Sequence, residues 1–204
     1  MNTINSYFEK TYRSISKLIV VVMLMATLSG CVTVAIAGVA IASIDILHDR
    51  RTAGEYIDDS SIELNATNYL LSRPELRASA HIKPDSWNGI LLITGEIDNE
   101  TYKQEVLAYL SSIQGVRQLV DETTITGKTP LLARTNDAWI TSKVKSSLVF
   151  KTGLKANRVK VITTRGTVYL MGIVTREEAE KATEISRSVR GVARVVRVFE
   201  FTES

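Results

Sequence analysis

The chain has 204 residues, of which 45% are hydrophobic and 23% charged, and its formal net charge at pH 7 is +3. These proportions are those of an ordinary globular protein, and they exclude a low-complexity or strongly charged disordered chain. A single cysteine excludes a scaffold held by disulfides within the chain.

Residues 1–30 have the anatomy of a secretory signal. Three basic residues precede an apolar run over 18–27, and Leu28-Ser29-Gly30-Cys31 then matches a lipobox, the cleavage and lipidation signal of bacterial lipoproteins. We therefore predict that the mature chain begins at Cys31, which carries a covalent diacylglycerol and an N-acyl lipid. The alternative is an uncleaved membrane anchor, because residues 18–44 contain no charge.

The residue after the cysteine predicts the destination. Val32 stands where an aspartate would retain such a lipoprotein in the inner membrane. We therefore expect a lipid anchor in the outer membrane, on its periplasmic side. Acylation of Cys31 leaves no thiol in the chain, so disulfides are excluded even in an oxidising compartment. The lipidated cysteine and a linker are expected to occupy residues 31–58.

The rest of the chain contains an internal repeat with a period of about 77 residues. The two copies match with offsets of 76 to 78 residues, and the two glycines of each hairpin are six residues apart in both copies. The matched pairs are Asp59 and Asp137, Ile62 and Ile140, Leu70 and Leu148, Leu76 and Leu154, Gly89 and Gly166, Gly95 and Gly172, and Gly115 and Gly191.

Each copy opens with a predicted helix. Apolar residues recur four apart, as in Ile140, Val144 and Leu148 of the second copy. Asp59 and Asp137 (or Asn136) stand where a helix N-cap is expected.

Two alternating runs then flank a turn, Thr164-Arg165-Gly166 in the second copy, which predicts a β-hairpin. A second helix follows. It begins at a capping box from Thr175 to Glu178, and we expect it to end where Gly191 adopts a left-handed conformation. A β-branched strand over 192–201 closes the copy. The predicted class is α+β, with two tandem αββαβ domains over 59–127 and 136–204, each packing two helices on a three-stranded mixed sheet.

The Gly-Val pair before the last strand and the segment Tyr169–Thr175 resemble the BON domain. Two such domains behind a lipobox resemble the dual BON-domain outer-membrane lipoproteins, and also the osmotically inducible periplasmic BON proteins. Segments 49–54 and 136–141 share that resemblance. It implies a non-enzymatic protein that supports outer-membrane integrity, and we expect the protein to be a monomer. It also implies that the second domain binds anionic phospholipid, such as phosphatidylglycerol or cardiolipin, and that the protein lies near the machinery that assembles outer-membrane β-barrels.

The two copies carry opposite charge. Residues 45–128 hold 8 basic and 14 acidic side chains, a net charge of −6, whereas residues 129–204 hold 14 and 7, a net charge of +7. A basic domain tethered to a membrane is expected to meet phospholipid headgroups. The alternative is that the two copies dock on each other and neutralise this charge internally.

The first helix of the second copy carries the predicted lipid-contact residues. At 100° per residue, Trp139, Lys143, Ser146 and Phe150 lie within about 60° of one another along one edge of the helix. Lys145 and Val149 also lie off the buried face. The resemblance places the family's lipid contacts at Trp139 and Val149, the latter a leucine in the family. The equivalent residues of the first copy are polar. The alternative is that Trp139 fills a seam between the copies and Phe150 covers the core. The candidate residues are Trp139, Lys143, Lys145, Ser146, Val149 and Phe150. The counterparts of Trp139, Lys143, Ser146 and Phe150 in the first copy are Ser61, Asn65, Asn68 and Ser72.

Other functions find little support in the sequence. His48 and His81 are isolated, so no metal site is expected, and we predict no cofactor besides the lipid on Cys31. No nucleophile motif is seen, so we predict no enzyme. A pI of about 9.0 would favour nucleic acid as partner in a cytosolic protein, but the export signal argues against it. The rival hypothesis is a protein-interaction adaptor for the β-barrel assembly machinery or another envelope partner, working through the acidic first copy or a strand edge.

Overall fold

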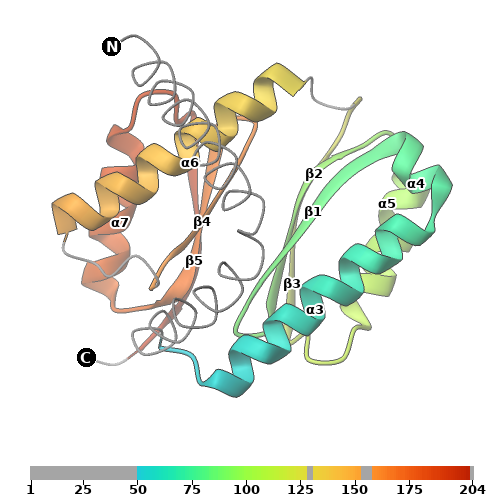
Figure 1. Ribbon diagram of the computed structural model, residues 1–204, viewed down its shortest axis with the longest axis horizontal. Helices are drawn as coiled ribbons and strands as arrows, with labels where there is room; N and C mark the ends of the chain where they lie inside the picture. Colours follow the sequence, from blue (N-terminus) through green and yellow to red (C-terminus); the bar gives the residue numbers. More distant parts are fainter. Residues whose placement is uncertain (1–49, 128–130, 153–157, 203–204) are drawn as a thin grey trace, which may run out of the picture. The chain divides into compact units, whose positions relative to one another are not determined.

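The computed structural model describes residues 50–127, 131–152 and 158–202 (Figure 1). Residues 48–204 form one compact unit. The predicted lipobox and Cys31 lie outside the described residues. We call residues 50–127 the first repeat and residues 131–202 the second repeat. Their elements are α3 (Ala53–Ser72), α4 (Pro74–Ser79), β1 (Ala80–Trp87), β2 (Ile90–Ile97), α5 (Glu100–Ser111) and β3 (Gln118–Ile125), then α6 (Leu131–Thr152), β4 (Lys160–Thr164), β5 (Thr167–Val174), α7 (Arg176–Ser188) and β6 (Arg194–Phe201).

Both repeats have the predicted order of helices and strands. In each, the first two strands form an antiparallel hairpin, and the third strand pairs in parallel with the second. A parallel neighbour requires a crossover, which α5 and α7 supply. The described residues therefore confirm the α+β class and the three-stranded mixed sheets. Helix α4 was not predicted; Pro74 at its first position fixes φ where a helix can begin.

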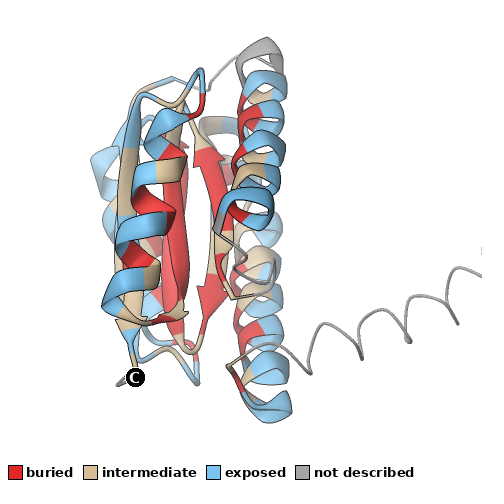
Figure 2. Ribbon diagram, turned by 90° about the vertical axis from the view of Figure 1, so that its left-hand side faces the viewer, coloured by how far each residue is buried: buried red, intermediate tan, exposed pale blue. Residues whose placement is uncertain are grey.

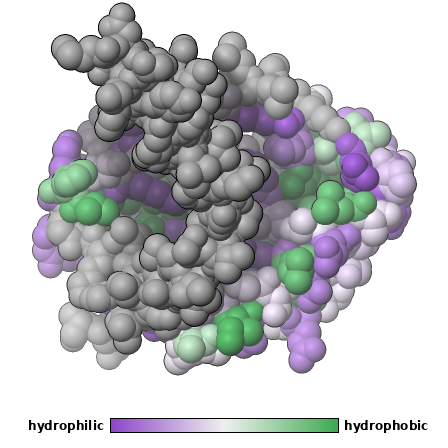
Figure 3. Space-filling view, viewed as in Figure 1, coloured by the Kyte–Doolittle hydropathy of each residue, from purple (hydrophilic) through white to green (hydrophobic). Residues whose placement is uncertain are grey.

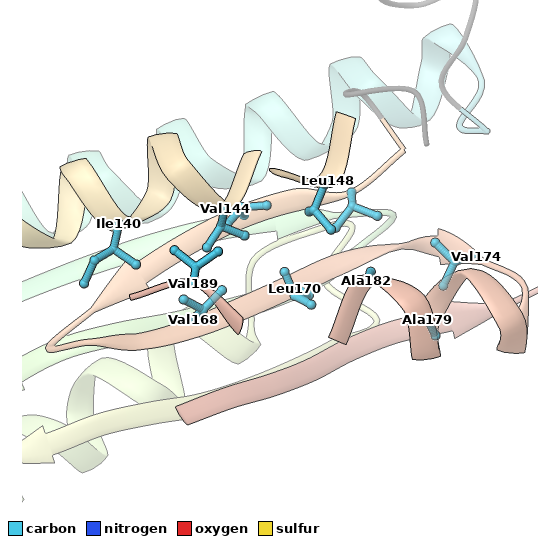
Figure 4. Close-up of a cluster of buried hydrophobic side chains, with 11 residues drawn as sticks. Ile140, Val144, Leu148, Val168, Leu170, Val174, Ala179, Ala182 and Val189 are labelled. Carbon is cyan, nitrogen blue, oxygen red and sulfur yellow. The ribbon is translucent and has the colours of Figure 1, made fainter. Parts of the chain in front are cut away.

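The helices of each repeat cover one face of its sheet. Ile140, Val144 and Leu148 of α6 are buried, as predicted, and they pack on Val168 and Leu170 of β5 (Figure 4). Figure 2 shows buried positions on the sides of the helices that face the strands and exposed positions outside. The first repeat has an equivalent cluster around Ile62, Leu91 and Ile93.

A third hydrophobic cluster, which we call the seam, joins the other faces of the two sheets. Side chains alternate along a strand, so Leu91 and Ile93 face the helices while Ile90 and Leu92 face the seam. Every residue of β2 is therefore buried. The seam decides a question that the sequence left open, because it shows that the two repeats pack together. Its members are Trp87, Ile90, Leu92, Ile162, Tyr169, Met171 and Val198.

The two matched aspartates are not N-caps. Thr52 caps α3 in a capping box with Glu55, and Asp59 lies inside the helix, so the stretch predicted as a linker is helical from Ala53. The carboxylate of Asp59 instead accepts hydrogen bonds from the backbone N–H groups of Asn88, at 2.6 Å, and Gly89, at 2.9 Å.

Asp137 lies inside α6 and does the same for the second hairpin. It accepts hydrogen bonds from the N–H groups of Arg165, at 2.8 Å, and Gly166, at 2.9 Å. Both central residues of each turn have positive φ: 51° and 73° in the first repeat, 52° and 73° in the second. This is the backbone of a type I′ hairpin, whose N–H groups need an acceptor once they are buried. Both copies therefore have an aspartate at this helix position because its carboxylate binds the turn of the neighbouring hairpin.

The second glycine of each hairpin is required by a close approach between strands. A Cβ on Gly95 would lie 2.0 Å from the carbonyl oxygen of His81, and one on Gly172 would lie 2.3 Å from that of Arg158. The six-residue glycine spacing therefore joins a turn glycine to a glycine that leaves room for the backbone at the start of the hairpin's first strand.

The predicted capping box of the last helix is confirmed, but its predicted end is not. Thr175 accepts a hydrogen bond from the N–H of Glu178, whose side chain accepts one in return from the N–H of Thr175. The helix ends at Ser188, before Gly191. Gly191 has φ of 99° in the following turn, where a Cβ would lie 3.2 Å from Ile140. The glycine thus shapes the turn into β6.

Two adjacent arginines at the start of the described chain bind different repeats. Arg50 donates to Glu178 of the second repeat at 2.7 Å and to the carbonyl oxygen of Ile173 at 2.9 Å. Arg51 pairs with Asp59 of the first repeat at 2.7 Å, and its guanidinium carbon lies 3.6 Å from the centre of the Trp87 ring. The chain that enters α3 is therefore bound to both repeats at once.

Replacing Gly95 with alanine should destabilise the protein. The new methyl group would collide with the His81 carbonyl oxygen, and φ of 116° is unfavourable for alanine. We expect a loss of about 1–3 kcal/mol in the free energy of unfolding, measured by urea denaturation of residues 48–204. Gly127→Ala is the matched control, because a Cβ there meets nothing within 4 Å. Equal stability of the two variants would contradict the close approach between Gly95 and the His81 carbonyl oxygen.

Asp59→Asn should lower stability and change its dependence on pH. Burial raises the pKa of Asp59, but hydrogen bonds from Gly89, Ser86 and Arg51 outweigh it and leave the pKa below its ordinary value. The ionised carboxylate therefore stabilises the fold above about pH 4, and this contribution is lost as the pH falls through the lowered pKa.

At pH 7 we expect Asp59→Asn to cost roughly 3 kcal/mol, since Arg51 loses its buried partner. Urea denaturation between pH 2 and pH 7 should show a smaller acid-induced loss in the variant than in the wild type. The control is Asp58→Asn at the neighbouring exposed position. If the free energy of unfolding of both variants depends on pH as it does in the wild type, the ionised Asp59 carboxylate does not stabilise the fold.

Candidate lipid-contact surface

Helix α6 presents a hydrophobic and basic edge to solvent. Phe150 is 87% exposed, Trp139 is 46% exposed and Val149 is 39% exposed. Lys143, Lys145 and Ser146 are also exposed. The structure thus places all six predicted residues on the solvent side of the helix. Hydrophobic side chains exposed together and rimmed by polar residues are typical of an interaction site, whereas single exposed ones are normal.

Trp139 and Lys143 lie one turn apart and contact each other. The Lys143 ammonium nitrogen is 4.2 Å from the centre of the Trp139 ring. A cation over an aromatic face is attracted by the electrons of the ring, an interaction of about 0.5–1 kcal/mol at an exposed site. It holds a positive charge beside an exposed indole, so both can reach one ligand together.

The alternative position for Trp139 is excluded. The tryptophan of the seam is Trp87, which is 6% exposed, and the core beneath α6 is filled by aliphatic side chains. Phe150 does not cover that core, since almost all of its surface is accessible.

Several charges of opposite sign do pair between the repeats. Lys160 lies between Glu63, at 2.5 Å, and Asp85, at 3.0 Å, both in the first repeat. Burial lowers the pKa of Lys160, but the two carboxylates raise it further, so the net shift is upward. Arg194 pairs with Glu122 at 2.8 Å. The alternative of internal docking between acidic and basic surfaces therefore does occur, at the rim of the seam.

The α6 edge takes no part in this neutralisation. Among the described residues, the second repeat's basic side chains that form ion pairs are Arg158, Lys160, Lys181 and Arg194, and neither Lys143 nor Lys145 is among them. The one acidic residue of α6, Asp137, is 8% exposed and turned toward the hairpin. The exposed edge of α6 is therefore positive.

The corresponding helix of the first repeat differs, partly as predicted. Ser61, Asn65, Asn68 and Ser72 are exposed and polar. However, α3 also exposes Ile57, Leu64 and Leu71, each more than half accessible, and Figure 3 shows hydrophobic side chains spaced along this helix. These three residues, which we call the α3 stripe, were missed by matching positions between the copies. Their seven-residue spacing is the signal that could have found them.

Neither a metal cluster nor a membrane span is found in the described part of the chain. The described residues contain no group of three potential ligands among His, Cys, Asp and Glu. None of the helices searched is long and apolar enough to cross a bilayer. Cys31 and His48 lie outside the described residues, so lipidation of Cys31 stays a prediction.

Comparison with known proteins identifies the class. The family model of the BON domain matches residues 136–203, which contain most of α6 and the rest of the second repeat. The first repeat has the same topology and the same aspartate beneath its hairpin turn.

Relatives in other bacteria identify the family. The outer membrane lipoprotein DolP of Haemophilus influenzae is 31% identical over 193 residues, which cover 95% of this chain and all of the relative. The 21 kDa hemolysin of Actinobacillus pleuropneumoniae is 30% identical over 76% of this chain and 80% of its own. Osmotically inducible protein Y of Escherichia coli is 23% identical over 70% and 72%. The chain therefore belongs to the BON-domain outer-membrane lipoproteins, which confirms the predicted family and location.

Proposed function

We propose that this lipoprotein is anchored through Cys31 in the periplasmic leaflet of the outer membrane and binds anionic phospholipid through helix α6. The observation that carries the proposal is the exposed edge with Trp139 and Phe150 beside two lysines that have no ion-pair partner in the described chain. We also propose that the protein is not an enzyme and supports outer-membrane integrity, as its resemblance to the family implies.

The composition of the edge fits the boundary between headgroups and acyl chains. Tryptophan and phenylalanine rings enter that boundary, while ammonium groups meet phosphates. Each lysine near an anionic surface contributes about 1 kcal/mol before screening. Complete burial of one large hydrophobic side chain contributes about 1.5–3 kcal/mol. The contact is therefore weak by itself but effective for a protein already held at the membrane.

Trp139→Glu should weaken binding to vesicles of phosphatidylglycerol or cardiolipin by at least about tenfold. The variant removes a ring from the headgroup boundary and adds a charge that the lipid repels. Binding is measured by vesicle sedimentation and by NMR shifts of residues 48–204, which we expect to concentrate at 137–151.

The matched control is Ser61→Glu, which adds the same charge at the equivalent exposed position of α3. Unchanged binding of Trp139→Glu, with the fold intact by circular dichroism, would refute the assignment of α6. Shifts spread over the first repeat would refute it as well.

A second function, as an adaptor for the β-barrel assembly machinery or another envelope protein, is favoured by the α3 stripe. Ile57, Leu64 and Leu71 face solvent on a helix whose outward neighbours are uncharged Ser and Asn. No residue of α3 is a lysine or arginine, so around Ile57 and Leu64 an apolar helix of a protein partner suits the stripe better than a lipid surface.

A photo-crosslinking residue at Leu64 in the full-length protein tests the adaptor function. We expect adducts in cells with a component of the β-barrel assembly machinery, because Leu64 is at the centre of the stripe. The same residue at Glu184, exposed on α7, is the control. Equal adducts from both positions, or none from Leu64, would count against the adaptor function.

A further inference from the structure

A hollow of about 310 Å³ lies between the first repeat and the first turns of α6, away from Trp139 and Phe150. It lies where the end of α3, the short helix α4 and the start of β1 meet the first turns of α6. These elements can be followed in Figure 1. The residues around it are Leu70, Leu71, Leu76, Arg77, Ala80, His81, Ile82 and Arg134.

The floor of the hollow is aliphatic. Leu76 is 2% exposed and belongs to the core of the first repeat, against which Leu70 and Ile82 pack. Leu71, at the lip, is 56% exposed. The hollow therefore joins a buried apolar floor to an exposed aliphatic side chain, which favours a ligand with a hydrocarbon portion.

The wall of the hollow is cationic. Arg77 and Arg134 both line it. The Nε of Arg134 is buried without a hydrogen-bond partner, and Arg134 forms no ion pair with another described residue. None of the residues around the hollow is an aspartate or a glutamate. Two arginines without a carboxylate beside them in the lining favour a ligand with an anionic oxygen.

We propose that this hollow binds a single-chain anionic amphiphile. A carboxylate or phosphate accepts hydrogen bonds from Arg134 and Arg77, and the first methylene groups lie on Leu70, Leu76 and Ile82. The volume is near the lower end of the range of about 300–1,000 Å³ typical of ligand pockets, so it suits one chain and not a two-chain phospholipid. The site does not involve the exposed edge of α6 around Trp139 and Phe150, and it needs no membrane surface.

Sodium dodecanoate below its micelle concentration is the probe, added to isotope-labelled residues 48–204, which form a compact unit with their own cores. We expect NMR shifts at residues 70–82 and at Arg134, with residues 139–150 unchanged. Shifts confined to 139–150 would overturn the proposal. Because the probe is monomeric, failure here leaves the vesicle binding of α6 as a separate result.

Variants and matched probes test each half of the ligand. Arg134→Glu should lower the affinity for dodecanoate at least about tenfold, whereas Arg190→Glu, the same change at an exposed arginine, should leave it unaltered. Leu71→Ser should also weaken binding. Acetate and dodecyl maltoside should each fail to reproduce the shifts. Equal binding of acetate, equal binding of dodecyl maltoside, or unchanged affinity in Arg134→Glu would each overturn the proposal.

Discussion

Burial of both faces of each sheet is the constraint on which the rest of the structure depends. One face of each sheet takes its own helices, and the other face takes the opposing sheet through the seam around Trp87, Tyr169 and Met171. Strands of this kind cannot present a flat face to a ligand, so recognition is left to helices, loops and strand edges. Helices α3 and α6 both expose hydrophobic side chains, but only α6 adds lysines to them.

The seam also explains why the opposite charges of the repeats do not simply cancel. Lys160, Arg117 and Arg194 pair across it with Glu63, Glu200 and Glu122. Such pairs cost desolvation and add modest net stability, but a mismatched charge would be penalised, so they favour one mutual arrangement of the sheets. The pairing is local to the rim of the seam. The basic edge of α6 lies outside it and remains available to an external anion.

Local patterns predicted local structure well. Periodicity predicted the buried face of α6, and Thr175 with Glu178 predicted a helix start, because both depend on residues within one or two turns. Asp59 and Asp137 were misassigned because an aspartate near a helix start usually serves that helix. Their hydrogen-bond partners lie 28 to 30 residues away, in a hairpin. The hollow beside Arg134 was equally invisible, since it joins residues more than 50 positions apart (134 minus 82).

The arginine pair at the entry to α3 has a mechanical consequence. In a lipoprotein anchored by its N-terminal end, movement of the membrane pulls on the residues that enter the folded part. Arg50 and Arg51 distribute that pull between Glu178 of one repeat and Asp59 of the other. A force along the tether therefore loads both repeats in parallel, before it can unwind α3 from its first turn. The two adjacent guanidinium groups thus divide between the two repeats any force that the membrane anchor transmits to the folded part.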